Sequence, residues 1–296
     1  MPSDGLNRLA SLKMHHSFTC SPVHPFTKFM HLAICIKYIP DPEAAFSMFS
    51  IDEQAKKVIP APGLKHVVSP FDEQAIEAAL RIREQHAGAR ITVITLGDEK
   101  SRNAIKHGLA MGADDGVLLA DAAFDDGDAY TTVLTLTAAL KKLGAIDLVL
   151  TGRQAADGDA GLVGAGIAER MDLPVISFAK EIIIENNQLR VERVLDDGTE
   201  VVETALPAVV TVSNEIGAPR APSLRETMRA ARKPVVVWTA ADLNLDAGTI
   251  GAAGARSVRE RVFAPSKVVQ CEFIEATTPE EQGALLAARL REVKVV

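Results

Sequence analysis

The residues best suited to bind a ligand lie in a glycine-rich, acidic segment at positions 151–164, which reads TGRQAADGDAGLVG. It follows an apolar run at 145–150 that predicts a buried strand, and it precedes a predicted helix at 160–170. A small polar turn from strand to helix places free backbone N–H groups at the carboxyl end of the strand. Because open parallel sheets bind nucleotides at that edge, the segment predicts a nucleotide site with Val163 and Gly164 as N–H donors.

The two acids in this segment, Asp157 and Asp159, do not suit the cradling of an anion. They could instead cap the following helix, or accept hydrogen bonds from ribose hydroxyls or an adenine amine. The spacing matches neither G-x-G-x-x-G nor a Walker loop, so the usual dinucleotide and NTPase assignments do not follow. An ordinary turn between a strand and a helix stays open as the alternative.

Neither a catalytic triad nor a metal-binding set occurs at recognisable spacing among the seven histidines and three cysteines. Cys35 lies in a predicted buried strand and is expected to be an inert core thiol. The cysteines are far apart and form no C-x-x-C pair, which favours a reducing compartment. We therefore expect no catalytic residue and no metal ligand.

The composition indicates an aliphatic α/β protein. Of 296 residues, 47% are apolar and only 4% are aromatic, so Ala, Val, Leu and Ile must form the core. The net charge of −7 argues against nucleic acid as the main partner. No apolar run approaches the roughly 20 residues that span a bilayer, so membrane insertion is not expected.

The elements that would position the site alternate between strand and helix. Predicted strands cover 32–39, 90–96, 116–119, 146–150 and 208–213, and predicted helices cover 70–85, 101–111, 128–143 and 160–170. This order predicts a doubly wound, mostly parallel sheet, with residues 43–69 as an irregular connection. Extended runs at 176–185, 189–195 and 199–205, separated by short turns, predict an antiparallel hairpin extension.

Three regions follow from these patterns. Residues 1–29 are expected to be a disordered tail or to precede a later start at Met14 or Met30, and residues 30–216 to form the nucleotide-binding domain. Residues 217–296 are expected to be a loop followed by a protruding C-terminal arm. In that arm Ser223 should cap a helix at 224–232, residues 246–255 should form an extended or flexible link, and Thr278 should cap a last helix.

The loop at 219–224 presents a leucine, Leu224, beside Arg220, Arg225 and Arg229. An apolar anchor with a basic rim suits docking to an acidic partner, because long-range charge steers the encounter. A surface helix with ordinary solvated charges is the alternative from spacing alone.

Several ordered segments together carry a family resemblance: residues 36–41 (IKYIPD), 69–80 (SPFDEQAIEAAL), 109–114 (LAMGAD), 152–159 (GRQAADGD) and 191–211 (VERVLDDGTEVVETALPAVVT). From about Met30 to its C-terminus the chain resembles the beta subunit of electron transfer flavoproteins, a family that includes FixA. The resemblance implies a Rossmann-like adenine-nucleotide-binding fold and a redox-active FAD held largely by an alpha subunit.

The same resemblance implies an electron carrier and not an enzyme in its own right. Its partners would be the alpha subunit, flavin dehydrogenases such as acyl-CoA dehydrogenases, and an electron transfer flavoprotein–quinone oxidoreductase. It implies a cytoplasmic location in a bacterium or the mitochondrial matrix in a eukaryote. It also reverses the preference at 219–224, where Arg220 and Leu224 match the partner-docking loop.

By match to the family motifs, the nucleotide should lie against residues that come from four parts of the chain. They are Cys35, Ser69, Pro70, Phe71, Asp72, Leu96, Gly152, Arg153, Gln154, Ala155, Ala156, Asp157, Gly158, Asp159, Ala160, Gly161, Leu162 and Val163.

Departures from the family patterns bear on which nucleotide binds. Ser69 stands where members that bind AMP commonly have Asn. Residues 157–159 resemble electron-bifurcating members, whose motif continues Thr-Ala-Gln-Val-Gly, whereas this chain continues AGLVG at 160–164. The missing polar residues favour AMP. The alternatives are a bifurcating subunit that binds a second FAD and uses NADH, and a stand-alone ATP- or AMP-binding module of the stress-protein kind.

Overall fold

The computed structural model describes residues 30–264 and 271–295. The expectation for residues 1–29 falls outside them. Within the described part, contacts divide the chain into two units. The first comprises residues 30–48 and 60–258, and the second comprises residues 49–59 together with the residues from 259 onward.

A nine-stranded sheet forms the centre of the first unit, in the order β11-β10-β9-β12-β8-β1-β6-β7-β13. Its strands are β1 (His31–Cys35), β6 (Arg90–Leu96), β7 (Asp115–Leu119), β8 (Leu148–Gly152), β9 (Val175–Glu185), β10 (Gln188–Leu195), β11 (Gly198–Ala205), β12 (Ala208–Val212) and β13 (Val236–Trp238). The strands from β9 through β12 to β13 pair in parallel, and β10 and β11 add antiparallel. The predicted α/β class with a mostly parallel sheet is confirmed.

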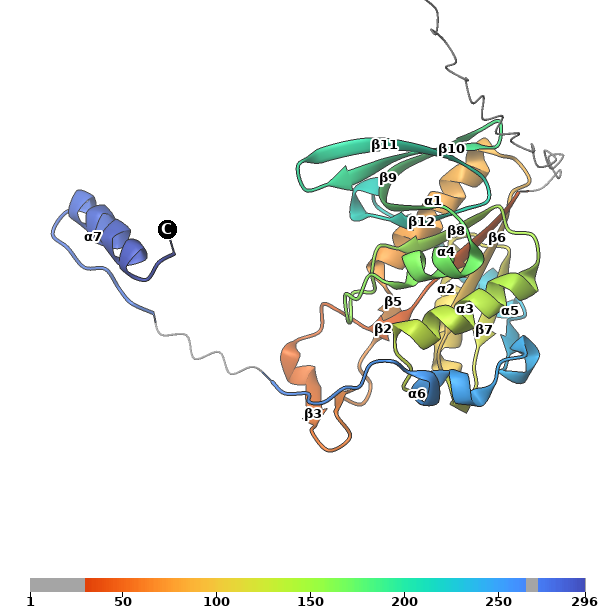
Figure 1. Ribbon diagram of the computed structural model, residues 1–296, viewed down its shortest axis with the longest axis horizontal. Coiled ribbons are helices and arrows are strands. Elements are labelled where there is room, and N and C mark those ends of the chain that lie inside the picture. The colour runs from red at the N-terminus through yellow and green to blue at the C-terminus, as the bar shows by residue number, and fades with distance from the viewer. Residues whose placement is uncertain (1–29, 265–270, 296) are drawn as a thin grey trace, which may run out of the picture. The chain divides into compact units, whose positions relative to one another are not determined.

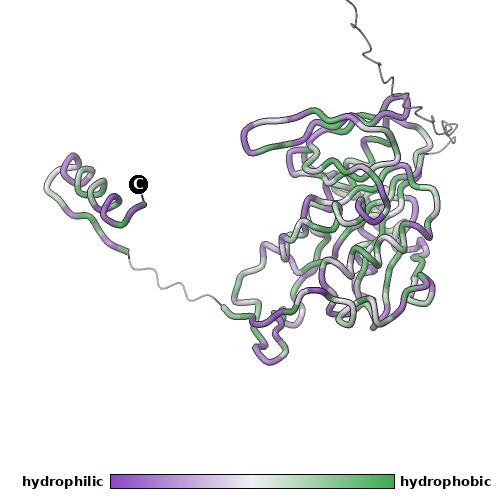
Figure 2. Tube along the Cα trace, viewed as in Figure 1, coloured by the Kyte–Doolittle hydropathy of each residue, from purple (hydrophilic) through white to green (hydrophobic). Residues whose placement is uncertain are grey.

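Helices cover both faces of this sheet (Figure 1). One face packs against α1 (Pro70–Gln85), α2 (Arg102–Met111) and α5 (Leu224–Arg232), and the other against α3 (Ala129–Leu143) and α4 (Val163–Met171). The strand side chains alternate between the two cores: Leu32 and Ile34 join the first, and Ala33 and Cys35 join the second. Figure 2 shows the apolar residues concentrated along the central strands of this unit.

The hairpin extension forms as the turn residues predict. Asn186 and Asn187, between β9 and β10, both adopt positive φ angles of 49° and 65°. Asparagine tolerates this conformation, which the tightest hairpin turns require at both central residues. Local chemistry therefore sets the register of β9 against β10, and Asp196, Asp197 and Gly198 make the corresponding turn to β11.

The predicted helix caps are also present. Asp128 accepts a hydrogen bond from the Thr131 N–H at the start of α3, and Ser223 accepts one from the Glu226 N–H at the start of α5. Thr278 caps α7 (Pro279–Glu292) through the Glu281 N–H. Each cap needs only residues three positions apart, which is why the sequence alone could place it.

Two sequence-based expectations about connections were wrong. The predicted strand at 32–39 divides into β1 and β2 (Tyr38–Pro40), and the supposedly irregular stretch at 43–69 contains β3 (Phe49–Asp52), β4 (Lys57–Pro60) and β5 (His66–Val68). β2 pairs with β5 and β3 pairs with β4, in two small sheets. These strands are only three or four residues long, too short to show a period in the sequence.

The segment at 217–258 packs within the first unit and does not begin a protruding arm. β13 extends the main sheet beside β7. Ile250 is completely buried and residues 247–249 and 251–254 form short helices, so residues 246–255 are neither an extended nor a flexible link. The small residues there allow close packing: α6 (Gly251–Gly254) begins at a glycine with φ of +53°, where a Cβ would lie 2.2 Å from the Ala123 carbonyl oxygen.

The second unit contains the β3–β4 hairpin and the chain after Val258. Arg259 donates from Nη1 to the Lys56 carbonyl oxygen at 3.0 Å. Helix α7 buries none of its residues within the described part of the chain. Among the described residues, no helix has the length and apolar character needed to cross a membrane.

Candidate functional site

A cavity of about 140 Å³ opens at the carboxyl ends of β1, β6 and β8. From β1 the chain winds outward through β6 and β7, and then returns through α3 to β8 on the other side of β1. The gap between β1 and β8 is therefore the topological switch point of the sheet, where open α/β folds bind their ligands. The cavity lining is Cys35, Ile36, Lys37, Asp72, Leu96, Thr132, Leu136, Thr151, Gly152, Gln154, Ala155 and Val163.

Asp72, in the first turn of α1, joins the ends of the two strands at this point. Its buried carboxylate accepts from the Lys37 N–H at 2.8 Å and from the Gly152 N–H at 3.0 Å. Burial raises the pKa of Asp72 to about 7, although these two hydrogen bonds act to lower it. The carboxylate thus holds two backbone segments that are far apart in the chain.

Gly152 is required by this arrangement. A Cβ at this position would lie 2.6 Å from Asp72 Oδ1 and 2.7 Å from Phe71 Cβ. Such distances are too short for any side chain, so the close approach of β8 to α1 depends on glycine. Gly164 similarly allows α4 to approach β12, because a Cβ there would lie 2.5 Å from Thr211 Cγ2.

The acidic loop beside the cavity is held by its own polar contacts. Lys37 Nζ lies 2.7 Å from Asp157 Oδ2, and Gln154 Nε2 donates to Asp159 Oδ1 at 2.9 Å. Neither acid caps α4, whose N-cap residue is Leu162 and whose first residue is Val163 instead of the predicted 160. The capping alternative for the two acids was therefore wrong, because the loop continues for three more residues.

The structure divides the predicted site residues into two groups. Those that line the cavity are Cys35, Asp72, Leu96, Gly152, Gln154, Ala155 and Val163. Those that do not are Ser69, Pro70, Phe71, Arg153, Ala156, Asp157, Gly158, Asp159, Ala160, Gly161 and Leu162. Most of the second group lies next to the first in sequence, and Ser69 Oγ accepts from the Ala156 N–H at 3.3 Å.

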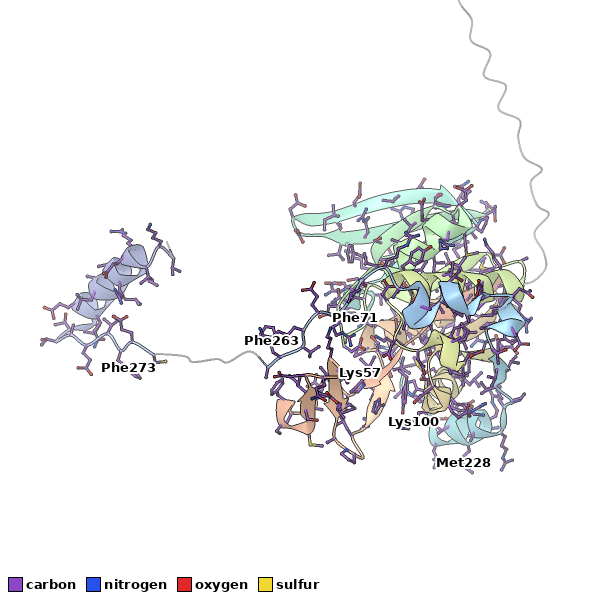
Figure 3. The ribbon with its side chains drawn as sticks, turned by 60° about the horizontal axis from the view of Figure 1, so that its bottom comes forward. Lys57, Phe71, Lys100, Met228, Phe263 and Phe273 are labelled. Carbon is purple, nitrogen blue, oxygen red and sulfur yellow. The ribbon has the colours of Figure 1, made fainter. Side chains whose placement is uncertain are left out.

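Arg153 points away from the cavity. Its guanidinium lies 4.8 Å from the centre of the Phe71 ring, whose side chain Figure 3 labels. With Arg193 and Phe178 it lines a separate cavity of about 270 Å³ near the hairpin extension. The family motif placed Arg153 in the right loop but could not give the direction of its side chain.

Thr151 begins the predicted segment at 151–164 but was not named as a nucleotide contact. Sequence reasoning missed Ile36, Lys37, Thr132 and Leu136 as lining residues. Two signals could have found them. Residues 36 and 37 belong to a segment that carries the family resemblance, and Thr132 and Leu136 are four residues apart on a predicted helix, so they share one face.

The site holds no obvious nucleophile or metal ligand set. Cys35 is buried, and burial raises the pKa of its thiol to about 12, so the sulfur is protonated and unreactive near neutral pH. The described residues contain no group of His, Cys, Asp and Glu able to hold a metal ion.

The predicted docking loop presents Leu224 with 78% of its surface exposed, at the first position of α5. Met228, one turn later, is 56% exposed and lies on the outer side of the helix in Figure 3. Arg220 differs from expectation because its guanidinium contacts Glu77 and Glu84 of α1. Its role in docking a partner stays a prediction.

Comparison with known proteins adds a decisive match. The family described as Electron transfer flavoprotein domain matches residues 58–243. The chain belongs to the electron transfer flavoprotein beta subunit and FixA family. Its predicted family is thereby confirmed.

Three relatives show the extent of the similarity. The chain is 36% identical over 266 residues to the electron transfer flavoprotein subunit beta of Thermoanaerobacterium thermosaccharolyticum, covering 89% of this chain and 94% of the relative. It is 34% identical over 270 residues to protein FixA of Azorhizobium caulinodans, covering 87% and 93%. It is also 34% identical over 267 residues to the caffeyl-CoA reductase–Etf complex subunit CarD of Acetobacterium woodii, covering 90% and 100%.

Proposed function

We propose that this chain is the beta subunit of a heterodimeric electron transfer flavoprotein, which carries electrons from flavin dehydrogenases toward a quinone oxidoreductase. In this proposal it binds an adenine nucleotide at the switch point between β1 and β8, and α5 docks the dehydrogenase. The observation that carries the nucleotide assignment is the cavity at that switch point, lined by the glycine-rich loop.

The lining fits an adenine ring better than a whole dinucleotide. Cys35, Leu96 and Leu136 provide apolar walls, while Gln154 and Lys37 provide polar groups. The cavity is smaller than the roughly 300–1,000 Å³ that enclose drug-sized ligands, so only part of the nucleotide would be enclosed. The first N–H groups of α4 and the Lys37 ammonium would favour the phosphate.

FAD, held mainly by the alpha subunit, would supply the redox chemistry when bound. The residues of this chain would hold the second nucleotide, complete the flavin environment at the subunit interface and present the docking helix. We expect none of them to act as an acid, a base or a nucleophile. Residues from 259 onward would pack against the alpha subunit.

AMP is the nucleotide we favour, and a second FAD is the main alternative. The alternative has one observation in its support: a Cβ at Gly158 would have no atom of a described residue within 4 Å other than its chain neighbours, and Leu162 is 60% exposed. The loop therefore leaves room beside the cavity for a larger ligand. A second FAD would make the heterodimer an electron-bifurcating enzyme component that uses NADH. The stand-alone module of the stress-protein kind gains no support from the family match.

Counting the bound nucleotides decides between these readings. The chain is co-expressed with its alpha subunit, the heterodimer is purified, and the cofactors are released by heat and quantified by chromatography. One FAD and one AMP per heterodimer is the expected result. Two FAD and no AMP would contradict the AMP assignment and support the bifurcating alternative. A homodimer with ATP and no flavin would contradict the whole proposal.

A cavity-filling variant tests whether the nucleotide occupies the switch-point cavity. Thr132→Tyr introduces a large ring from the half-buried face of α3 into the cavity and should lower AMP content roughly tenfold or more, with FAD content unchanged. Lys141→Tyr, at an exposed position of the same helix, is the control and should retain both nucleotides. Equal AMP content in both variants would place the nucleotide elsewhere.

A further inference from the structure

The loop that leads into α5 is tied to α1 by a buried carboxylate. Glu77 accepts three hydrogen bonds from Arg220, namely from its N–H at 3.1 Å, from Nε at 2.8 Å and from Nη2 at 3.0 Å. It also accepts from Arg81 Nε at 2.9 Å, and its side chain is only 5% exposed. Such charge-assisted, two-pronged contacts fix geometry more firmly than single neutral hydrogen bonds.

The Arg81 side chain contacts backbone carbonyl groups of the same loop. Its Nη1 donates to the Ile216 carbonyl oxygen at 2.6 Å, and its Nη2 lies 3.4 Å from the Ala218 carbonyl oxygen. Gly217, between them, has a φ of +106°, and a Cβ there would lie 3.2 Å from Arg81 Nη2. The loop is therefore set in one conformation by side chains of α1.

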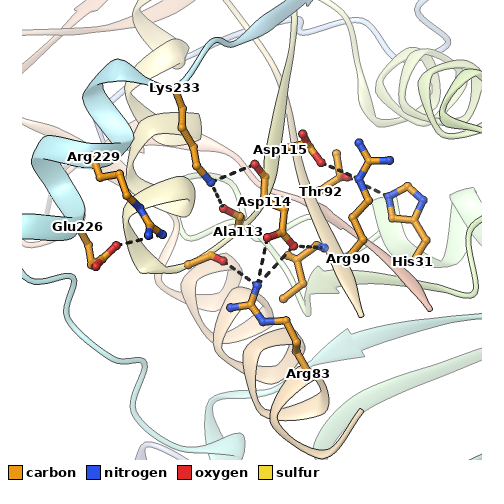
Figure 4. Close-up of polar contacts among 12 residues, drawn as sticks. His31, Arg83, Arg90, Thr92, Ala113, Asp114, Asp115, Glu226, Arg229 and Lys233 are labelled. Carbon is orange, nitrogen blue, oxygen red and sulfur yellow. Dashed lines mark hydrogen bonds and ion pairs between the residues drawn. The ribbon is translucent and has the colours of Figure 1, made fainter. Parts of the chain in front are cut away.

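The other end of α5 is held as well. Lys106 Nζ of α2 donates to the carbonyl oxygens of Ala230 and Ala231 at 3.1 and 3.0 Å, which serves as a C-terminal cap. Lys233 Nζ donates to the carbonyl oxygens of Ala113 and Asp114 at 3.0 and 3.1 Å, as Figure 4 shows. In the same view Arg83 of α1 binds the turn that carries these carbonyls, through Gly112 and Asp114.

These contacts leave the outer face of α5 uncovered. Leu224 and Met228 are one helical turn apart and both exposed, and Arg225 and Arg229 are exposed beside them. The Arg220 guanidinium, by contrast, donates its hydrogen bonds to Glu77 and Glu84. The basic rim available to a partner thus excludes Arg220.

We propose that Glu77 is a positioning residue for electron-donor docking: it fixes Arg220, and through Arg220 it sets the orientation in which α5 presents Leu224. The inference rests on the proposed function, because it assumes that α5 is the docking element. A helix held in its bound orientation loses less conformational freedom when the partner binds, so affinity is the property that Glu77 should control.

The electrostatics agree with a permanent contact. Burial raises the pKa of Glu77, but the hydrogen bonds from Arg220 and Arg81 outweigh it and leave the pKa below its ordinary value. Those same contacts with Glu77 and Glu84 hold the pKa of Arg220 above its ordinary value. Both groups are therefore charged throughout the neutral range.

The test uses the co-expressed heterodimer and an acyl-CoA dehydrogenase purified from the same organism and reduced by its acyl-CoA substrate. Glu77→Gln should raise the KM for the dehydrogenase-to-flavin electron transfer roughly fivefold or more, with kcat and FAD content unchanged. Arg220→Lys should act in the same direction, because an ammonium cannot reproduce the two-pronged contact. Glu73→Gln is the matched control, because Glu73 lies on the same helix as Glu77 but pairs with His107 of α2, and it should leave KM unchanged.

Leu224→Ala separates this inference from the docking proposal. If Leu224→Ala raises KM, and Glu77→Gln causes no further rise in KM in the double variant, then the docking role of α5 and the positioning role of Glu77 are both supported. If Leu224→Ala raises KM but Glu77→Gln does not, the positioning role is overturned and the docking helix remains. If neither raises KM, α5 is not the docking element.

Hydrogen exchange then tests the positioning directly. Amide exchange in residues 217–224 should become roughly tenfold faster in Glu77→Gln than in Glu73→Gln, since the loop loses its anchor. Unchanged exchange in this segment would overturn the positioning role whatever the kinetics show.

Discussion

Single carboxylates show how strongly the environment decides what a residue does. Asp72 and Asp128 both accept backbone hydrogen bonds at the start of a helix. Burial dominates at Asp72 and raises its pKa to about 7. At Asp128, burial also raises the pKa, but hydrogen bonds from Thr131, Arg256 and Ser257 outweigh it and hold the pKa well below its usual value. The number of donors relative to the depth of burial makes the difference.

The raised pKa of Asp72 predicts a pH-dependent stability. Folded Asp72 binds its proton more tightly than the unfolded chain does, so its contribution to the free energy of unfolding falls as pH rises from about 4 to about 7. We expect the free energy of unfolding of wild type minus that of Asp72→Asn to fall over this window, by up to about 1.4 kcal/mol per pH unit. Urea unfolding at pH 4, 5, 6 and 7 measures it.

Asp159→Asn is the control for this series, because Asp159 lies in the exposed loop beside the same cavity. Its difference from wild type should not follow the same course. A constant difference between wild type and Asp72→Asn from pH 4 to 7 would mean that Asp72 keeps its ordinary pKa.

At the residue scale, the sequence predicted which loop lines the cavity better than it predicted side-chain directions. Gly152 and Asp72 could be named by family motif, but their contact joins positions 80 apart and depends on how α1 packs on β8. Arg153 could be named too, yet its stacking on Phe71 follows from packing that no motif records. Tertiary contacts, rather than residue type, settle such directions.

At the element scale, local sequence rules correctly predicted the features whose defining residues are neighbours in the sequence. The caps Asp128, Ser223 and Thr278 and the Asn186-Asn187 turn need only neighbouring residues. β13 has three residues and exists because β7 offers it a partner edge, so no local pattern could predict it. Residues 246–255 looked flexible because small residues are common both in links and in tight packing.

Asp128 provides a test at this scale because it joins two elements. It caps α3 through the Thr131 N–H at 3.0 Å and also accepts from the N–H groups of Arg256 and Ser257 at 2.7 and 2.9 Å. Asp128→Ala should lower stability by about 1–2 kcal/mol and expose residues 256–257 to proteolysis. Asp128→Ser keeps a capping hydroxyl, so it should release residues 256–257 with a smaller loss of stability.

Thermal unfolding and limited proteolysis followed by mass spectrometry measure the two effects separately. Equal stability of the Ala and Ser variants would show that the cap contributes little. If the peptide bond between residues 256 and 257 resists proteolysis in both variants, other contacts hold that segment.

At the scale of the whole molecule, one helix serves both candidate sites. Asp72, in the first turn of α1, borders the cavity, while Glu77, Arg81 and Arg83 hold the loop and turn around α5. The alternation of strands and helices predicted the doubly wound sheet that places α1 there. It could not predict that residues 217–258 would pack within the same unit, because their contacts are with α2, α3 and β7.

Helix α7 belongs to the other unit and carries the last prediction. Leu286 and Val293 are exposed and share one face with Leu290, and no residue of the helix is buried within the described part of the chain. An exposed apolar stripe on such a helix indicates a surface that binds another protein, and we expect that protein to be the alpha subunit.

A charge in this stripe tests the expectation. Leu286→Asp should weaken heterodimer association roughly tenfold or more, while nucleotide binding at the β1–β8 cavity persists. Ala284→Asp adds the same charge on a different face and should associate like wild type. Dissociation constants from sedimentation or interferometry distinguish the two, and equal constants for both variants would mean that α7 does not bind the alpha subunit through this face.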